Sequence, residues 1–206
     1  VPDNRLLGLY TQRRPAASGG VWDRVAALQR FETALGTQSP SAISKTLPTA
    51  WREMRAARLA VPFAALFAED LSKVVLSGRT ADVAYEMLLL SPLYEAADQV
   101  YPTRALRNPV AKGAAAGEMA GGITADGMAG AVLTAFSNGT PDTAIIADAQ
   151  TGALGHALLR TLDLTHAGAA GDVAQLATGL ATLRALGLED VARRTALQVL
   201  LLEGTS

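Results

Sequence analysis

The sequence predicts an all-α protein, and three observations support that class. No segment shows the alternation of apolar and polar residues that a half-buried strand requires. Helix starts are marked where Ser or Thr is followed directly by Pro, at Ser39-Pro40, Ser91-Pro92 and Thr140-Pro141. A hydroxyl in this position accepts a hydrogen bond from a free backbone N–H, and proline suits the first helical position because it has no N–H to leave unpaired.

Helix ends are marked by glycine, because the residue after a helix often adopts the left-handed conformation that glycine tolerates best. We expect such ends at Gly36, Gly78, Gly139 and Gly187. These starts and ends together predict about a dozen short helices. The expected helices cover residues 4–12, 21–35, a short stretch from Pro40, 49–59, 62–76, 81–90 capped by Thr80, 93–100, 110–120, 124–137, 141–150, 153–165, 172–186 and 188–203, with a loop at 13–20.

The connections between these helices are short, so neighbouring helices should lie antiparallel. A repeated unit of helix, glycine, cap and helix favours stacked hairpins, that is, an α-solenoid-like array. An irregular helical bundle with the same helix signals is the alternative. We expect a single all-helical domain over residues 1–206, with a possible subdivision near 103–124. Because the chain begins with Val1 instead of Met, we also expect it to be part of a longer precursor.

The last expected hairpin resembles the helical hairpins of tetratricopeptide-like repeats. The segment from Leu180 through Gly187 to Arg194 has small residues at packing positions and a glycine turn. The resemblance covers about one repeat and lacks the Trp, Tyr and Pro positions of that family's signature. It implies a repeat-like helical pair and indicates no ligand.

Composition favours an interaction protein over several other classes. Half of the residues are hydrophobic, only 18% are charged, and the mean hydropathy is +0.21, which suits an apolar face covered by a partner or a second copy. No uncharged stretch reaches the length of a membrane-spanning helix. The net charge of −1 gives no general attraction to nucleic acid, although residues 1–60 carry nine basic and four acidic residues. The chain has no cysteine, which excludes disulfides and thiolate chemistry.

The segment of residues 112–122 is the most unusual stretch of the chain. Gly113, Gly117 and Gly121 recur every four residues, so on a helix they would form one flat stripe open to a partner. Glu118 would be the acid of this surface. The segment lacks the Gly-Lys-Ser/Thr ending of a phosphate-binding loop. A tight helix crossing is the structural alternative.

A second candidate surface is basic. Arg52 and Arg55 lie three residues apart beside Trp51, a pattern that could bind nucleic acid or an acidic partner. The alternative is an ordinary amphipathic helix with Trp51 turned inward and the arginines in water. The apolar run Leu200–Leu202 near the C-terminus is a further candidate interface, whereas Phe63 and Phe67 should form a core stripe.

No set of residues specifies a reaction. The two histidines, His156 and His166, are ten positions apart, which does not suit a helical metal site. We therefore expect no metal and no cofactor. The sequence favours a non-enzymatic helical scaffold that binds a protein or peptide, with a homo-oligomer as a second way to cover its apolar face. The alternative is an enzyme or small-molecule binder with a site between helices near Glu118 and His156. Abundant alanine and arginine, with three lysines, favour a bacterial periplasmic or exported protein.

Overall fold

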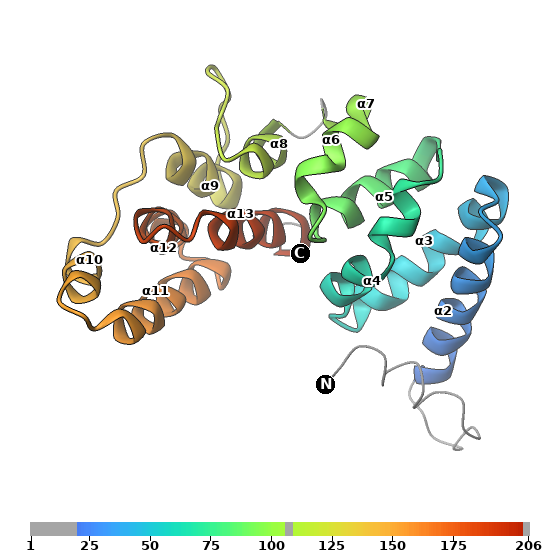
Figure 1. Ribbon diagram of the computed structural model, residues 1–206, viewed down its shortest axis with the longest axis horizontal. Helices are drawn as coiled ribbons and strands as arrows, with labels where there is room; N and C mark the ends of the chain where they lie inside the picture. The colour runs from blue at the N-terminus through green and yellow to red at the C-terminus, as the bar shows by residue number, and fades with distance from the viewer. Residues whose placement is uncertain (1–19, 106–108, 204–206) are drawn as a thin grey trace. The chain divides into compact units, whose positions relative to one another are not determined.

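The computed structural model describes residues 20–105 and 109–203, and every regular element in these ranges is helical (Figure 1). The all-α class is therefore confirmed. The helix expected at residues 4–12 lies outside the described residues. The chain divides into two compact units, Val1–Tyr101 and Pro102–Ser206. Each unit is described by itself below.

Unit 1 consists of helices joined by short connections. Its elements are α2 (Val21–Gly36), α3 (Pro40–Ala56), α4 (Ala60–Ser72), α5 (Gly78–Leu89), the 3-10 turn η1 (Tyr94–Ala96) and α6 (Ala97–Val100).

Unit 2 begins with two short helices and ends in a π-helical turn. Its elements are α7 (Pro102–Ala105), α8 (Pro109–Ala116), α9 (Gly127–Ser137), α10 (Thr143–Gln150), α11 (Leu154–Ala169), α12 (Val173–Ala185), α13 (Glu189–Gln198) and η2 (Val199–Glu203).

The core of unit 1 is an aromatic cluster contributed by three helices. Phe31 of α2 lies 5.4 Å from Phe63 and 5.3 Å from Phe67 of α4, measured between ring centroids. Trp51 of α3 lies 6.1 Å from Phe63. All four side chains are buried, so the predicted core stripe of Phe63 and Phe67 is confirmed. Aromatic pairs at these spacings add stabilisation beyond the apolar area that they bury.

The two helices expected between Pro40 and residue 59 are in fact one. α3 continues through Pro48, although proline removes one hydrogen bond of a helix and crowds the preceding turn. The helix survives because one face is strongly apolar: Ile43, Leu47 and Trp51 are all buried on it.

Several helix starts differ from the sequence signals. Ser39 caps α3 as predicted, since its Oγ accepts from the backbone N–H of Ala42. Thr140-Pro141 does not start α10, however, because the Asp142 carboxylate accepts from two backbone N–H groups. A carboxylate beside the positive end of a helix is a better cap than a threonine. Thr80 lies buried inside α5 instead of capping it.

The glycines that were expected to end helices do so only in part. Gly187 has a φ of 80° after α12, as a helix-ending glycine should. Gly78 instead begins α5, and Gln38 takes the left-handed conformation that follows α2.

Unit 2 is organised around α12, which contacts α9, α11 and α13. The α11–α12 crossing is close because each helix has a glycine at the contact. A Cβ on Gly168 of α11 would lie 2.6 Å from the Cα of Leu176, and one on Gly179 of α12 would lie 2.9 Å from the Cγ2 of Thr165. Two glycines thus let the backbones of α11 and α12 approach each other.

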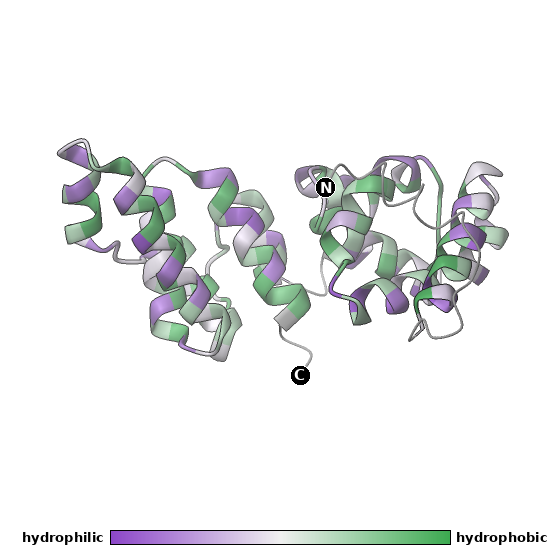
Figure 2. Ribbon diagram, turned by 90° about the horizontal axis from the view of Figure 1, so that it is seen from below, coloured by the Kyte–Doolittle hydropathy of each residue, from purple (hydrophilic) through white to green (hydrophobic). Residues whose placement is uncertain are grey.

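Hydrophilic and hydrophobic residues alternate around most helices, so few of them are apolar on all sides (Figure 2). Among the described residues, no helix combines the length and the apolarity needed to cross a membrane.

Candidate functional site

The glycine stripe predicted for residues 113–121 does not form, because α8 ends at Ala116. Gly117 adopts a φ of 76° and terminates the helix, with the N–H of Glu118 bonded to the carbonyl of Gly113. Gly113 is buried under Met119, and Gly121 lies in the loop between α8 and α9 with open space where a Cβ would be. The four-residue spacing therefore reflects a helix end followed by a loop, and this expectation was wrong.

An arginine from α12 holds the base of this loop. The guanidinium of Arg184 donates to the carbonyls of Gly117 (3.3 Å) and Ala135 (3.1 Å). It also lies over the ring of Phe136, 4.6 Å from the centroid, and pairs with Glu189 at 2.9 Å. Arg184 joins segments 49 and 67 residues away in the sequence, so no local pattern could identify its role.

Glu118 lines a cavity of about 560 Å³ that is formed by residues 118–123 and by α9. The side chain of Glu118 is exposed. His156 is not among the residues that line this cavity, so the cavity by itself does not join the two residues of the predicted small-molecule site. An enzymatic role for these two residues stays a prediction.

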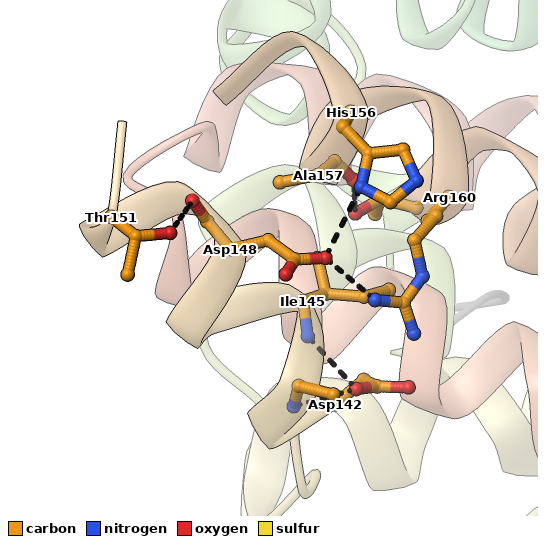
Figure 3. Close-up of polar contacts among 9 residues, drawn as sticks. Asp142, Ile145, Asp148, Thr151, His156, Ala157 and Arg160 are labelled. Carbon is orange, nitrogen blue, oxygen red and sulfur yellow. Dashed lines mark hydrogen bonds and ion pairs between the residues drawn. The ribbon is translucent and has the colours of Figure 1, made fainter. Parts of the chain in front are cut away.

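His156 instead belongs to a surface cluster at the α10–α11 junction (Figure 3). The carboxylate of Asp148 lies between its ring and Arg160, 3.3 Å from Nδ1 of His156 and 2.7 Å from a guanidinium nitrogen of Arg160. The His156 side chain is 64% exposed. Thr151 donates its hydroxyl to the Asp148 backbone carbonyl, so this hydroxyl serves the turn after α10. No group of three potential His, Asp or Glu metal ligands occurs in the described parts of the chain.

The predicted basic surface is split between solvent and a helix contact. Arg52 is exposed and pairs with Glu53, whereas Arg55 is only 24% exposed and pairs with Glu86 of α5. The indole Nε1 of Trp51 also donates to Glu86, at 3.2 Å. Burial raises the pKa of the Glu86 carboxyl, and the nearby Arg55 and Trp51 only partly oppose this effect. Arg55 thus connects α3 to α5, while Arg52 lies at the surface and is paired with its neighbour Glu53.

Unit 2 also has a groove of about 360 Å³ between α11 and the end of α13 with η2. We call it the α11–α13 groove. Its walls are four residues of α11 and four of α13 and η2, namely Leu162, Thr165, His166, Ala169, Thr195, Gln198, Val199 and Leu202. Leu202 belongs to the C-terminal apolar run that the sequence marked as a candidate interface. The remaining members were not identified from the sequence.

The orientation of α11 explains why the groove is apolar. The buried positions of this helix are all occupied by small residues, namely Ala157, Thr161, Thr165 and Gly168, and two of these, Thr165 and Gly168, lie at the close crossing with α12. None of its five leucines is fully buried, and three of them, Leu154, Leu159 and Leu162, are exposed. Leu159 is 64% exposed and Leu162 is 53% exposed, although both are as hydrophobic as the residues that fill the core.

Comparisons of the chain with protein-family models, with curated proteins and with solved structures found no significant match.

Proposed function

We propose that this protein is a non-enzymatic helical interaction module, and that the α11–α13 groove binds a short apolar helix of a protein partner. The exposed leucines on α11 carry this proposal. Large apolar residues that face solvent beside a concave apolar surface are typical of protein-binding sites.

The spacing of the groove residues suits a helical ligand. Leu162, Thr165 and Ala169 follow one another at intervals of three and four along α11. Thr195, Gln198 and Leu202 repeat the same intervals along α13 and η2. Two such rows form a channel that can receive the apolar face of an amphipathic helix.

The chemistry of the walls indicates an uncharged apolar anchor. No Lys, Arg, Asp or Glu is among the described residues that line the groove. His166, Thr195 and Gln198 supply hydrogen-bonding groups at its margins, and Leu162, Val199 and Leu202 supply the apolar surface. A volume of about 360 Å³ is near the lower end of ligand sites, which favours one or two inserted side chains over a large cofactor.

The arrangement of α11, α12 and α13 supports the solenoid-like hypothesis. The groove is lined by the C-terminal parts of both α11 and α13, and α12 contacts both helices. Alternate helices that share one binding surface, with the intervening helix packed against them, are what a stacked-hairpin array would produce. On this proposal, the groove corresponds to the inner surface of such an array.

A peptide selection followed by matched substitutions tests the proposal. Peptides selected on the full chain from a random display library should be amphipathic and apolar, and their binding should be measured by fluorescence anisotropy. Leu162→Glu should weaken binding at least tenfold, because it places a charge in an apolar contact. Leu66→Glu is the control, since Leu66 is also an exposed leucine (41%) but lies on α4 of unit 1.

Equal binding to both variants would contradict the proposal. Circular dichroism of both variants should match that of the natural chain, because neither side chain is buried. A crystal structure with the selected peptide seated elsewhere would also reject the groove.

A further inference from the structure

A second groove, in unit 1, has a different chemistry. It has a volume of about 770 Å³ and lies between α2 and α3. We call it the α2–α3 groove. Three alanines, Ala26, Ala34 and Ala42, are among its lining residues, so its floor is shallow and presents little bulk.

The charged side chains of this groove all have one sign. Arg30 from α2 and Lys45 from α3 line it, and no acidic residue is among its described lining residues. Both cations are exposed, and neither forms an ion pair with any residue in the described ranges. The surrounding stretch of residues 20–60 has the same bias, with six basic and three acidic residues.

These two cations differ from most others in the described parts of the chain. Arg55, Lys73, Arg160, Arg184 and Arg193 each contact a carboxylate. Arg30 and Lys45 are unpaired within the described ranges and lie on two helices that pack against each other. The other unpaired cations of those ranges, Arg24, Arg58, Arg79 and Lys112, do not line the groove. Their combined field extends over roughly one Debye length, about 10 Å at 0.1 M salt.

The polar groups beside the cations add hydrogen-bond donors. The hydroxyls of Thr33, Thr37 and Thr46 are already bonded to carbonyls of their own helices. Gln29 and Ser41 have no such bond among the described residues, so an amide N–H and a hydroxyl are available at the groove. Two cations and two neutral donors form a set that recognises carboxylate oxygens.

From this charge complementarity, we propose that the α2–α3 groove binds a short acidic peptide segment, rich in Asp or Glu, of a protein partner. A nucleic acid fits less well, because no aromatic side chain lines the groove to stack on a base. The chain's own residues 1–19 are a poor charge match, since they carry three arginines and one aspartate. This inference is independent of the α11–α13 groove, which lies in the other unit and is apolar.

A labelled peptide of alternating glutamate and alanine is the probe. Anisotropy titration of this peptide with the full chain should show saturable binding that weakens as salt is added. The double variant Arg30→Glu/Lys45→Glu should lose affinity by about tenfold or more, because two exposed attractions become repulsions. The neutral variant Arg30→Gln/Lys45→Gln should lose less, and it keeps the experiment valid if charge reversal disturbs the fold.

The double variant Arg79→Glu/Lys112→Glu is the charge-matched control. Both residues are exposed cations outside the groove, and neither pairs with a described residue. This control should keep the affinity of the natural chain. An equal loss in both reversed variants would show a general charge effect and would overturn the proposal, as would an absence of binding.

Two further outcomes would assign the groove to another occupant. Tighter binding of a single-stranded oligonucleotide, lost in Arg30→Glu/Lys45→Glu, would replace the acidic peptide with nucleic acid. A change in the sedimentation coefficient of the unliganded protein on the same substitution would place a second copy in the groove. Either result would refute an acidic peptide as the ligand.

Discussion

Gly168→Ala is the substitution that tests how α11 and α12 are held together. Gly168 is buried in α11, and a Cβ at this position would lie 2.6 Å from the Cα and Cβ of Leu176 and 2.7 Å from its backbone nitrogen. Real Cβ atoms do not approach a backbone this closely. Because Leu176 is itself part of α12, the contact can be relieved only if the two helices separate.

Two opposing effects set the size of the change. Replacing glycine with alanine inside a helix gains about 1 kcal/mol from backbone entropy and helix propensity. Overpacking a well-packed contact costs about 1–3 kcal/mol. Gly155→Ala on the same helix is the matched control, because nothing lies within 4 Å of a Cβ there. The propensity gain is largely shared, so Gly168→Ala should be less stable than Gly155→Ala by about 1–3 kcal/mol.

Urea denaturation of the full chain, followed by far-ultraviolet circular dichroism, measures this difference. Both tryptophans, Trp22 and Trp51, lie in unit 1, so fluorescence follows that unit and separates its transition from that of unit 2. The double variant Gly168→Ala/Gly179→Ala should cost less than the sum of the single variants, because one separation of the helices accommodates both methyl groups. If Gly168→Ala were as stable as Gly155→Ala, the close crossing of α11 and α12 would be refuted.

Two further predictions concern local contacts. Asp142→Ala should lower the free energy of unfolding by about 1 kcal/mol, because the two N–H groups that begin α10 lose their acceptor. Asp142→Asn should be nearly neutral, since asparagine caps helices equally well. Thermal melts of both variants check this prediction. Tyr85 donates its hydroxyl to Asp98 at 2.9 Å, and burial, together with this carboxylate, raises its pKa above the usual 10.0. The stabilisation from Tyr85 is therefore fully present below about pH 10 and is lost as the pH rises further. The melting temperature of Tyr85→Phe should consequently fall less steeply at alkaline pH than that of the natural chain. An identical slope in the two proteins would contradict the raised pKa of Tyr85.

The fold class could be predicted because helix signals are local. Capping hydroxyls, glycine and apolar periodicity act within a few residues, and they placed most helices close to their true positions. Errors arose where two local signals competed. Asp142 displaced Thr140-Pro141 as the start of α10, since a carboxylate is the stronger acceptor. α3 continued through Pro48 because its buried face outweighs the loss of one backbone hydrogen bond.

The candidate sites were harder to predict because they depend on contacts between distant segments. Gly117 looked like part of a helical stripe, but a Cβ on it would lie 2.3 Å from the guanidinium of Arg193. Only the fold shows that this arginine, 76 positions later in the sequence, occupies that space. Similarly, Arg55 resembled a surface residue until its pairing with Glu86 of α5 placed it between two helices.

The leucines of α11 show how a local sequence pattern is connected with a contact between distant segments. The sequence gives this helix five leucines, and an amphipathic helix would normally bury several of them. None is fully buried, because the buried positions of α11 hold only alanine, threonine and glycine, two of which lie at the close crossing with α12. Leu154, Leu159 and Leu162 are exposed, and the other two leucines are half-buried. The small buried residues of α11 thus permit a close approach to α12, and three of the helix's leucines are left exposed.

The exposed area of these leucines limits the binding free energy that a partner can gain by covering them. Fully burying a leucine is worth about 1.5–3 kcal/mol, so covering Leu154, Leu159 and Leu162, which are 51%, 64% and 53% exposed, would yield about 3–5 kcal/mol. That free energy corresponds to about millimolar affinity even before the entropy of association is subtracted. A partner held at micromolar affinity must therefore also fill the space between Leu162 and Leu202. If the proposed function is correct, a ligand that covers only the outer surface of α11 should bind more weakly than one that also enters the α11–α13 groove, so the groove should determine which peptides are selected.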